Sequence, residues 1–154
     1  LKAEQLILKN PINTVIRTSV IYDWDYRARF FNSVIKNLQN NQEVNATTDV
    51  YNSVTFLDNL VESIFKVITL NQNGIFHVVD SACVNRFEFA EMIAKIFRLD
   101  KNLIKIASVQ DEPKNIAKRP KNACLNNSKA KKELGLNFNT IEEGVSRVFM
   151  KSQL

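Results

Sequence analysis

Short runs of β-branched residues alternate with amphipathic segments along this chain, and this alternation constrains its fold more than any other feature. Apolar residues recur with helical spacing in segments 1–9, 29–39, 56–70, 86–98 and 128–134, and again after Thr140. Four runs between these segments predict strands at 13–19, 44–48, 74–79 and 104–107. Helices that alternate with such strands predict an α/β fold with a largely parallel sheet.

Polar residues mark where several helices should begin and end. Three patterns have the spacing of a capping box, in which the first side chain accepts a backbone hydrogen bond and the second returns one: Thr55-x-x-Asp58, Asn85-x-x-Glu88 and Thr140-x-x-Glu143. Asn126 and Asn127 precede the short helix at 128–134 and could cap it. Gly135 follows that helix and suits a left-handed terminal position.

The composition is that of a soluble globular domain. The chain has 154 residues, of which 45% are hydrophobic and 24% charged, enough to bury a core. No apolar run approaches the roughly 20 residues of a membrane span, and no signal-peptide pattern opens the chain. Cys83 and Cys124 lie far apart without metal-ligand spacing, so we expect reduced, partly buried thiols in a cytoplasmic protein. His77 lies in an apolar run, where we expect a satisfied or surface-facing strand histidine.

Basic residues are concentrated in the last third of the chain. The net charge is +5, and residues 100–132 contain nine Lys or Arg against three Asp or Glu. Such a face attracts either nucleic acid or a small anionic ligand. The basic residues are not interleaved with aromatic residues or glycine, and no nucleic-acid-binding motif is present. We therefore expect a small anion, such as a nucleoside diphosphate, rather than nucleic acid.

The basic segment 118–135 offers one arginine in a restrained setting. Pro120 fixes its own φ and biases Arg119 towards an extended conformation. A short apolar stretch and a capped helix follow, so the guanidinium could be aimed at a fixed anion. A solvated basic loop is the alternative that the residues alone leave open.

The same segment resembles the closing signature of the dTDP-4-dehydrorhamnose reductase family, which are extended short-chain dehydrogenase/reductases acting on nucleotide sugars. The matching residues are Arg119, Pro120, Asn122, Leu125, Asn126, Ser128 and Lys129. Earlier stretches are similar to the same family at Leu1, Ala3, Glu4, Arg17, Thr18, Ser19, Tyr22, Asp49, Ser53, Thr55, Asp58, Gly74 and His77.

The resemblance implies the C-terminal part of a Rossmann-type parallel sheet with a small α/β substrate-binding domain. Residues 1–22 and 44–79 would belong to the nucleotide-binding sheet, and residues 23–43 and 80–154 to the nucleotide-sugar part. The family's catalytic Tyr-x-x-x-Lys would fall just before Leu1. The chain has three glycines and no Gly-rich dinucleotide turn. We therefore expect a piece of a longer protein that lacks the N-terminal dinucleotide-binding half.

The resemblance also assigns ligand-binding residues, but no catalytic or metal-binding residue. Thr18 and Ser19 would lie close to the nicotinamide of NAD(P)H, which the complete protein would bind and this chain alone would not hold. Arg119 would bind the diphosphate of a nucleotide sugar, and the base and sugar would contact Phe31, Asp49, Tyr51, Ser53 and Thr55.

The sequence departs from the family pattern at several of these places. Val20 stands where the family often has Trp, and Arg29 and Phe30 lie where it often has Asn-rich residues. Asn52 replaces a glycine, and it would be the best substitute if a positive φ is needed.

Three functional hypotheses follow from the resemblance. The first is the substrate-binding half of an NAD(P)H-dependent nucleotide-sugar reductase, in which a 4-keto sugar is reduced. The second is a non-catalytic regulatory module of the same fold, like the beta subunit of methionine adenosyltransferase. The third is a related epimerase or dehydratase. A homodimer is compatible with all three, whereas a membrane partner is not expected.

Overall fold

The computed structural model describes residues 2–24, 29–108 and 120–153, and within them short strands pair into four small sheets. Three pairs are parallel: β1 (Thr14–Arg17) with β6 (Gly74–His77), β2 (Ile21–Tyr22) with β5 (Thr55–Phe56), and β3 (Val44–Thr47) with β8 (Ile104–Ala107). In the fourth sheet, β4 (Tyr51–Ser53) lies between antiparallel β7 (Cys83–Asn85) and parallel β9 (Asn122–Ala123). The predicted α/β class with mainly parallel pairing is confirmed.

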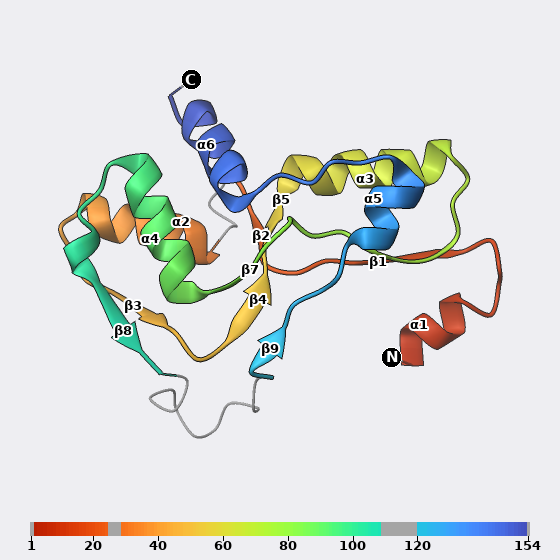
Figure 1. The fold of residues 1–154 in the computed structure, drawn as a ribbon, viewed down its shortest axis with the longest axis horizontal. Helices are drawn as coiled ribbons and strands as arrows, with labels where there is room; N and C mark the ends of the chain where they lie inside the picture. The colour runs from red at the N-terminus through yellow and green to blue at the C-terminus, as the bar shows by residue number, and fades with distance from the viewer. Residues whose placement is uncertain (1, 25–28, 109–119, 154) are drawn as a thin grey trace.

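The helices gather at the two ends of these sheets (Figure 1). At one end α2 (Arg29–Gln39) and α4 (Arg86–Phe97) lie beside β3 and β8, and at the other α1 (Lys2–Ile7), α3 (Leu57–Thr69) and α5 (Ser128–Leu134) lie beside β1 and β6. The last helix, α6 (Ile141–Lys151), packs on α4, and a short 3-10 turn covers Lys101–Leu103. The predicted bounds of α2 and α5 match these ranges.

Two of the three predicted capping boxes are present. Asn85 Oδ1 accepts a hydrogen bond from the Glu88 backbone N–H at 2.8 Å, and Glu88 returns one to the Asn85 N–H at 3.1 Å. Thr140 and Glu143 repeat the arrangement at the start of α6.

The capping box predicted at Thr55 is wrong. Helix α3 has Phe56 as its N-cap, without a side-chain cap. Thr55 lies in β5, where its hydroxyl donates to the backbone oxygen of Ser19 at 2.7 Å. Asp58 binds Lys151 of α6 at 2.9 Å. Both side chains therefore hydrogen-bond to residues distant in sequence, Ser19 and Lys151, and do not cap the helix.

The cap of α5 also differs in detail from the prediction. Asn127 is its N-cap, but the side-chain nitrogen donates instead to the backbone oxygen of Val79 at 2.8 Å. Asn126 Oδ1 accepts the Ser128 N–H at 2.8 Å. Gly135 adopts the expected left-handed conformation, with φ of 63°.

Two apolar clusters form the core. The larger one packs rings from β2, α2 and α4, with Tyr22 lying 5.4 Å from Phe31 and 5.3 Å from Phe89 between ring centroids. The smaller one joins α3, β6 and α5 through residues such as Phe76 and Leu134. The smaller cluster spans both predicted domains, and the division at residues 22, 43 and 79 stays a prediction.

His77 is a satisfied strand histidine, as expected. Its Nε2 lies 3.3 Å from Arg17 Nη1, and its Nδ1 lies 3.1 Å from the backbone oxygen of Asn126. The same arginine forms an ion pair with Glu4 of α1 at 2.7 Å. These contacts hold α1 against the end of β1.

A buried carboxylate lies between the two clusters. Asp80 is 2% exposed and accepts hydrogen bonds from the Tyr22 hydroxyl at 2.8 Å, the Phe56 N–H at 3.1 Å and the Asn59 amide at 2.8 Å. Burial raises the pKa of Asp80 to about 6, and the hydrogen bonds from Asn59, Tyr22 and Phe56 oppose this rise. Burial, together with the adjacent Asp80, also raises the pKa of Tyr22.

We expect Asp80 to make the protein less stable as the pH rises. Its pKa is about 6 in the folded state and 3.8 in the reference state, so the folded state binds more protons between these values. The contribution of this group to the unfolding free energy should therefore fall by roughly 2–3 kcal/mol from about pH 4 to pH 7. Urea denaturation at a series of pH values should show this fall in the parent and not in Asp80→Asn. Parallel profiles would contradict the assignment.

Gly144 of α6 should not tolerate alanine. A methyl group there would overlap the Tyr22 hydroxyl and touch Phe56. The gain in helix propensity is about 1 kcal/mol, whereas overpacking a core costs about 1–3 kcal/mol. Gly144→Ala should therefore lower the unfolding free energy, while Ser146→Ala on the same helix should leave it nearly unchanged or raise it. A more stable Gly144→Ala variant would show that Tyr22 can move without cost.

Candidate functional site

A cavity of 340 Å³ lies between the β7–β4–β9 sheet and helices α2 and α4. Most of its wall is apolar and includes Val20, Phe30, Val54, Phe89, Pro120 and Ala123. The polar side chains on the described wall are those of Asn52, Asn85 and Arg86. A concave apolar site with a few convergent polar groups is typical of a small-molecule pocket.

The register of the three strands decides which residues face this cavity. Asn52 on β4 pairs with Val84 on β7 and with Ala123 on β9, and all three line the cavity. Successive side chains of a strand alternate between its two faces. Tyr51 and Ser53 therefore lie on the face of β4 that points away from the cavity.

This alternation affects four of the predicted substrate-binding residues. Asp49, Tyr51, Ser53 and Thr55 are all absent from the cavity wall, which takes alternate residues 50, 52 and 54 instead. Ser53 is 1% exposed and faces a second, more open hollow of 370 Å³ on the opposite side. The substrate-binding role of these four residues stays a prediction.

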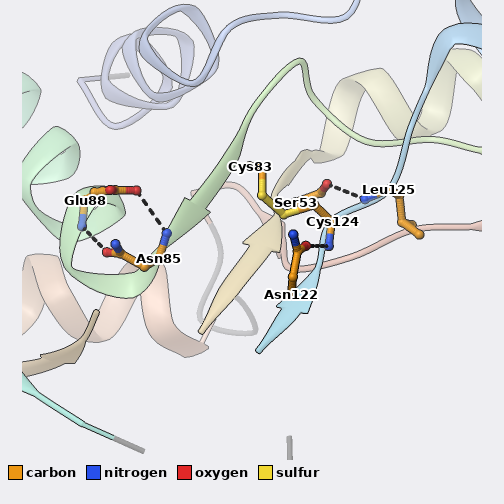
Figure 2. The surroundings of a disulfide bond; sticks show 7 residues. All are labelled: Ser53, Cys83, Asn85, Glu88, Asn122, Cys124 and Leu125. Carbon is orange, nitrogen blue, oxygen red and sulfur yellow. Dashed lines mark hydrogen bonds between the residues drawn. A yellow bond between two sulfur atoms is a disulfide. The ribbon is translucent and has the colours of Figure 1, made fainter. Parts of the chain in front are cut away.

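Their hydrogen bonds show what the same residues do within the fold. Ser53 Oγ accepts the Leu125 N–H at 3.0 Å, which fixes the segment after β9 (Figure 2). Asp49 accepts a hydrogen bond from the Ser108 hydroxyl at 2.7 Å. Tyr51 is 38% exposed, and its backbone N–H donates to the Lys121 oxygen at 2.9 Å.

The two residues predicted to lie near the cofactor do come together with Thr55. The Thr18 hydroxyl donates to Thr55 Oγ1 at 3.0 Å, and Thr55 in turn donates to the backbone oxygen of Ser19. Val20 follows directly and lines the cavity. The β1–β2 connection that holds Thr18 and Ser19 is thus continuous with the cavity wall.

The structure describes Phe31, one of the predicted substrate-binding residues, but it does not describe Arg119. Phe31 is 2% exposed, and its ring packs in the larger core cluster against Tyr22 and Phe89. The neighbouring Phe30 is the phenylalanine of α2 that lines the cavity. Arg119 lies outside the described residues, but Pro120 beside it lines the cavity.

Asn52 would be the best substitute for a glycine if a positive φ were needed, and the structure shows no such need. Asn52 lies in strand β4, and within the described ranges the non-glycine residues with positive φ are Asn41, Asn71 and Arg98. Pairing on both sides holds Asn52 in an extended conformation.

Cys83 and Cys124 form a disulfide, so the prediction of reduced thiols is wrong for this structure (Figure 2). The two residues are 41 positions apart in sequence, but their Cα atoms lie 5.6 Å apart. This distance suits a disulfide. Ser53 on β4 pairs with Cys83 on one side, and Cys124 directly follows β9 on the other. The bridge therefore ties together the two strands that flank β4.

The model of the RmlD substrate binding domain matches residues 1–154. The chain belongs to this family. The spore coat polysaccharide biosynthesis protein SpsK of Bacillus subtilis (strain 168) is 28% identical over 134 residues, which make up 86% of this chain and 46% of SpsK.

Solved structures of dTDP-4-dehydrorhamnose reductases share the fold of this RmlD-type domain. The enzyme from Bacillus anthracis, solved in complex with NADP, has a TM-score of 0.79 and 24% identity over 90% of this chain and 48% of that one. A hypothetical dTDP-4-dehydrorhamnose reductase from Sulfolobus tokodaii has a TM-score of 0.73 and 31% identity over 88% of this chain and 47% of that one. The RmlD-type domain thus spans about half the length of these relatives.

The described residues contain neither a metal-binding cluster nor a membrane-spanning helix. No group of three or more His, Cys, Asp or Glu side chains in these ranges could hold a metal ion. Within the same ranges, no helix combines the length and apolar character that a membrane crossing requires.

Sequence reasoning missed several wall residues of this RmlD-type domain. Asn85 was assigned only a capping role, and Arg86 was treated as the first residue of a helix. Val84 lies in β7, a strand too short to give a periodic signal. The departures noted at Val20 and Phe30 were the available clue, because both residues line the cavity.

The disulfide should contribute measurably to stability. A bridge that closes a loop of this length stabilises a protein by about 2–4 kcal/mol. Cys83→Ser, Cys124→Ser and the double variant should each lower the unfolding free energy by a similar amount, because each removes the same bridge. Urea denaturation with and without a reductant checks this, since reductant should destabilise only the parent. The bridge would be contradicted if reductant left the unfolding free energy of the parent unchanged and both thiols were alkylated without reduction.

Proposed function

We propose that this chain forms the sugar-nucleotide-binding part of an NAD(P)H-dependent reductase that acts on a 4-keto sugar nucleotide, like a dTDP-4-dehydrorhamnose reductase. One observation carries the proposal. Three stretches that resemble this reductase family, distant in sequence, meet at one cavity: Val20 follows Thr18-Ser19, residues 50, 52 and 54 form one wall, and Pro120 with Ala123 forms another.

The composition of the cavity supports a sugar nucleotide as its ligand. Apolar walls can pack against a deoxysugar ring or a base, while the amides of Asn52 and Asn85 can hydrogen-bond hydroxyl or carbonyl groups. Segment 118–121, which contains Pro120, carries three basic residues next to the cavity in sequence. In this proposal Arg119 binds the diphosphate.

The chain's own residues fit only one end of the dinucleotide cofactor. Thr18 and Ser19 lie beside the cavity, where a nicotinamide would face the sugar. The three glycines have other places: Gly74 begins β6, Gly135 ends α5, and Gly144 packs against Tyr22. None of them forms a turn that could hold a pyrophosphate. We therefore assign the cofactor's phosphates to residues outside this chain and derive no step of hydride transfer here.

Helix α3 supports the existence of such a further part. Its buried residues are Asn59, Ser63 and Val67, whereas its apolar stripe is exposed: Val61 44%, Ile64 40%, Phe65 64% and Ile68 64%. An apolar stripe on the outer face of a helix normally packs against another element. We propose that the dinucleotide-binding half covers this stripe in the complete protein.

The disulfide bears on where such an enzyme would work. We propose a cytoplasmic location, as the sequence suggested, although disulfides are uncommon in that compartment. Differential alkylation in intact cells would show whether Cys83 and Cys124 are reduced or disulfide-bonded there. Reduced thiols would agree with the cytoplasm, whereas a bridge would indicate an oxidising compartment or a redox role.

The complete protein should oxidise NADPH or NADH when dTDP-4-dehydrorhamnose is present. It should leave the cofactor unchanged with dTDP-glucose, which lacks the 4-keto group, and the 154-residue chain alone should show no turnover. Loss of cofactor absorbance measures the reaction, and calorimetry with dTDP-glucose measures binding separately. Binding without turnover would favour the regulatory module instead. Absence of both binding and turnover would overturn the proposal.

A further inference from the structure

The cavity holds unused hydrogen-bonding capacity. Within the part of the chain that the structure describes, the side chain of Asn52 makes no hydrogen bond. The Asn85 oxygen caps α4, but its amide nitrogen donates none. Because no buried side-chain nitrogen or oxygen of the described residues lacks a partner, this nitrogen must reach accessible space. The cavity is the space that Asn85 lines.

Arg86 adds a charge to the same wall. It is the only charged residue on the described part of the wall, and it follows Asn85 as the first residue of α4. Its guanidinium carbon lies 5.2 Å from the centroid of the Phe30 ring, and both residues are half-buried. A guanidinium at this distance from a ring is within the range of a cation–π contact, which restrains the side chain. Arg86 thus places a restrained positive charge beside apolar walls.

The position of this pair also coincides with the departures from the family pattern. Phe30 stands where the resemblance led us to expect Asn-rich residues, and Val20 stands where it led us to expect Trp. Both lie on the cavity wall together with Arg86. The Phe30 ring that contacts Arg86 is therefore one of the departures from that pattern.

We infer that Arg86, held by Phe30, binds a phosphate group of the sugar nucleotide from the α4 side, with the amides of Asn52 and Asn85 as neighbouring hydrogen-bond donors. The inference rests on the proposed function and adds to it a phosphate-binding residue on α4. The apolar wall would strengthen the pairing of the Arg86 guanidinium with a phosphate, because charge-assisted hydrogen bonds gain strength where water is excluded.

Calorimetry on the complete protein tests the role of Arg86. The probes are dTDP and UDP, each compared with its uncharged nucleoside. Arg86→Met retains an apolar stem against Phe30 and should weaken diphosphate binding by roughly ten- to a hundredfold. Nucleoside binding should not change. Arg147→Met removes the same charge at an exposed site on α6 and should change diphosphate binding by about twofold at most.

The outcomes separate this inference from the proposed function. If the parent binds a diphosphate and Arg86→Met binds it equally well, the role of Arg86 is overturned while the proposed function stands. If the parent binds neither dTDP nor UDP, both are overturned. Should Arg86→Met fail to fold, Arg86→Lys decides: it keeps the charge but loses the planar fork. It should bind the diphosphate more weakly than the parent, and equal binding would overturn the inference.

Discussion

The carboxylate of Asp80 joins segments that are far apart in sequence and that together place the cavity. Its side chain accepts hydrogen bonds from β2 through Tyr22 and from the start of α3 through Phe56 and Asn59. Its backbone binds Val54, which follows β4 and lines the cavity. A buried carboxylate is costly unless it is hydrogen-bonded or protonated. The neighbours of Asp80 are therefore constrained to remain in place, and the elements that carry the cavity wall are held with them.

Sequence patterns predicted the long elements well because those elements carry enough residues to show a period. The bounds of α2, α5 and β8 matched, and the capping boxes of α4 and α6 formed as the spacing indicated. The strands β2, β4, β5, β7 and β9 are two or three residues long and show no period. These strands form through pairing with other strands, so they can be recognised only in the tertiary structure. Three of them, β4, β7 and β9, form the floor of the cavity.

The candidate site was predicted less well than the fold, and the reason is the alternation of side chains along β4. The motif residues Ser53 and Thr55 make hydrogen bonds that hold Leu125 and Ser19, whereas Asn52 and Val54 face the cavity. A matching motif identifies a segment, but it does not say which face of a strand lines a cavity. Residues that support the backbone can match a family pattern as closely as residues that contact its ligand.

The disulfide and the α3 stripe show a chain that is cross-linked at its candidate site and exposes an apolar helix face elsewhere. The Cys83–Cys124 bridge and the Ser53–Leu125 hydrogen bond tie both neighbours of β4 together, so they add to the contacts by which Asp80 holds the cavity wall. Helix α3 instead exposes Phe65 and Ile68 while it buries Asn59. An exposed apolar stripe of this kind is typical of a helix face that packs against another element. The dinucleotide-binding half in the proposed function would supply that element.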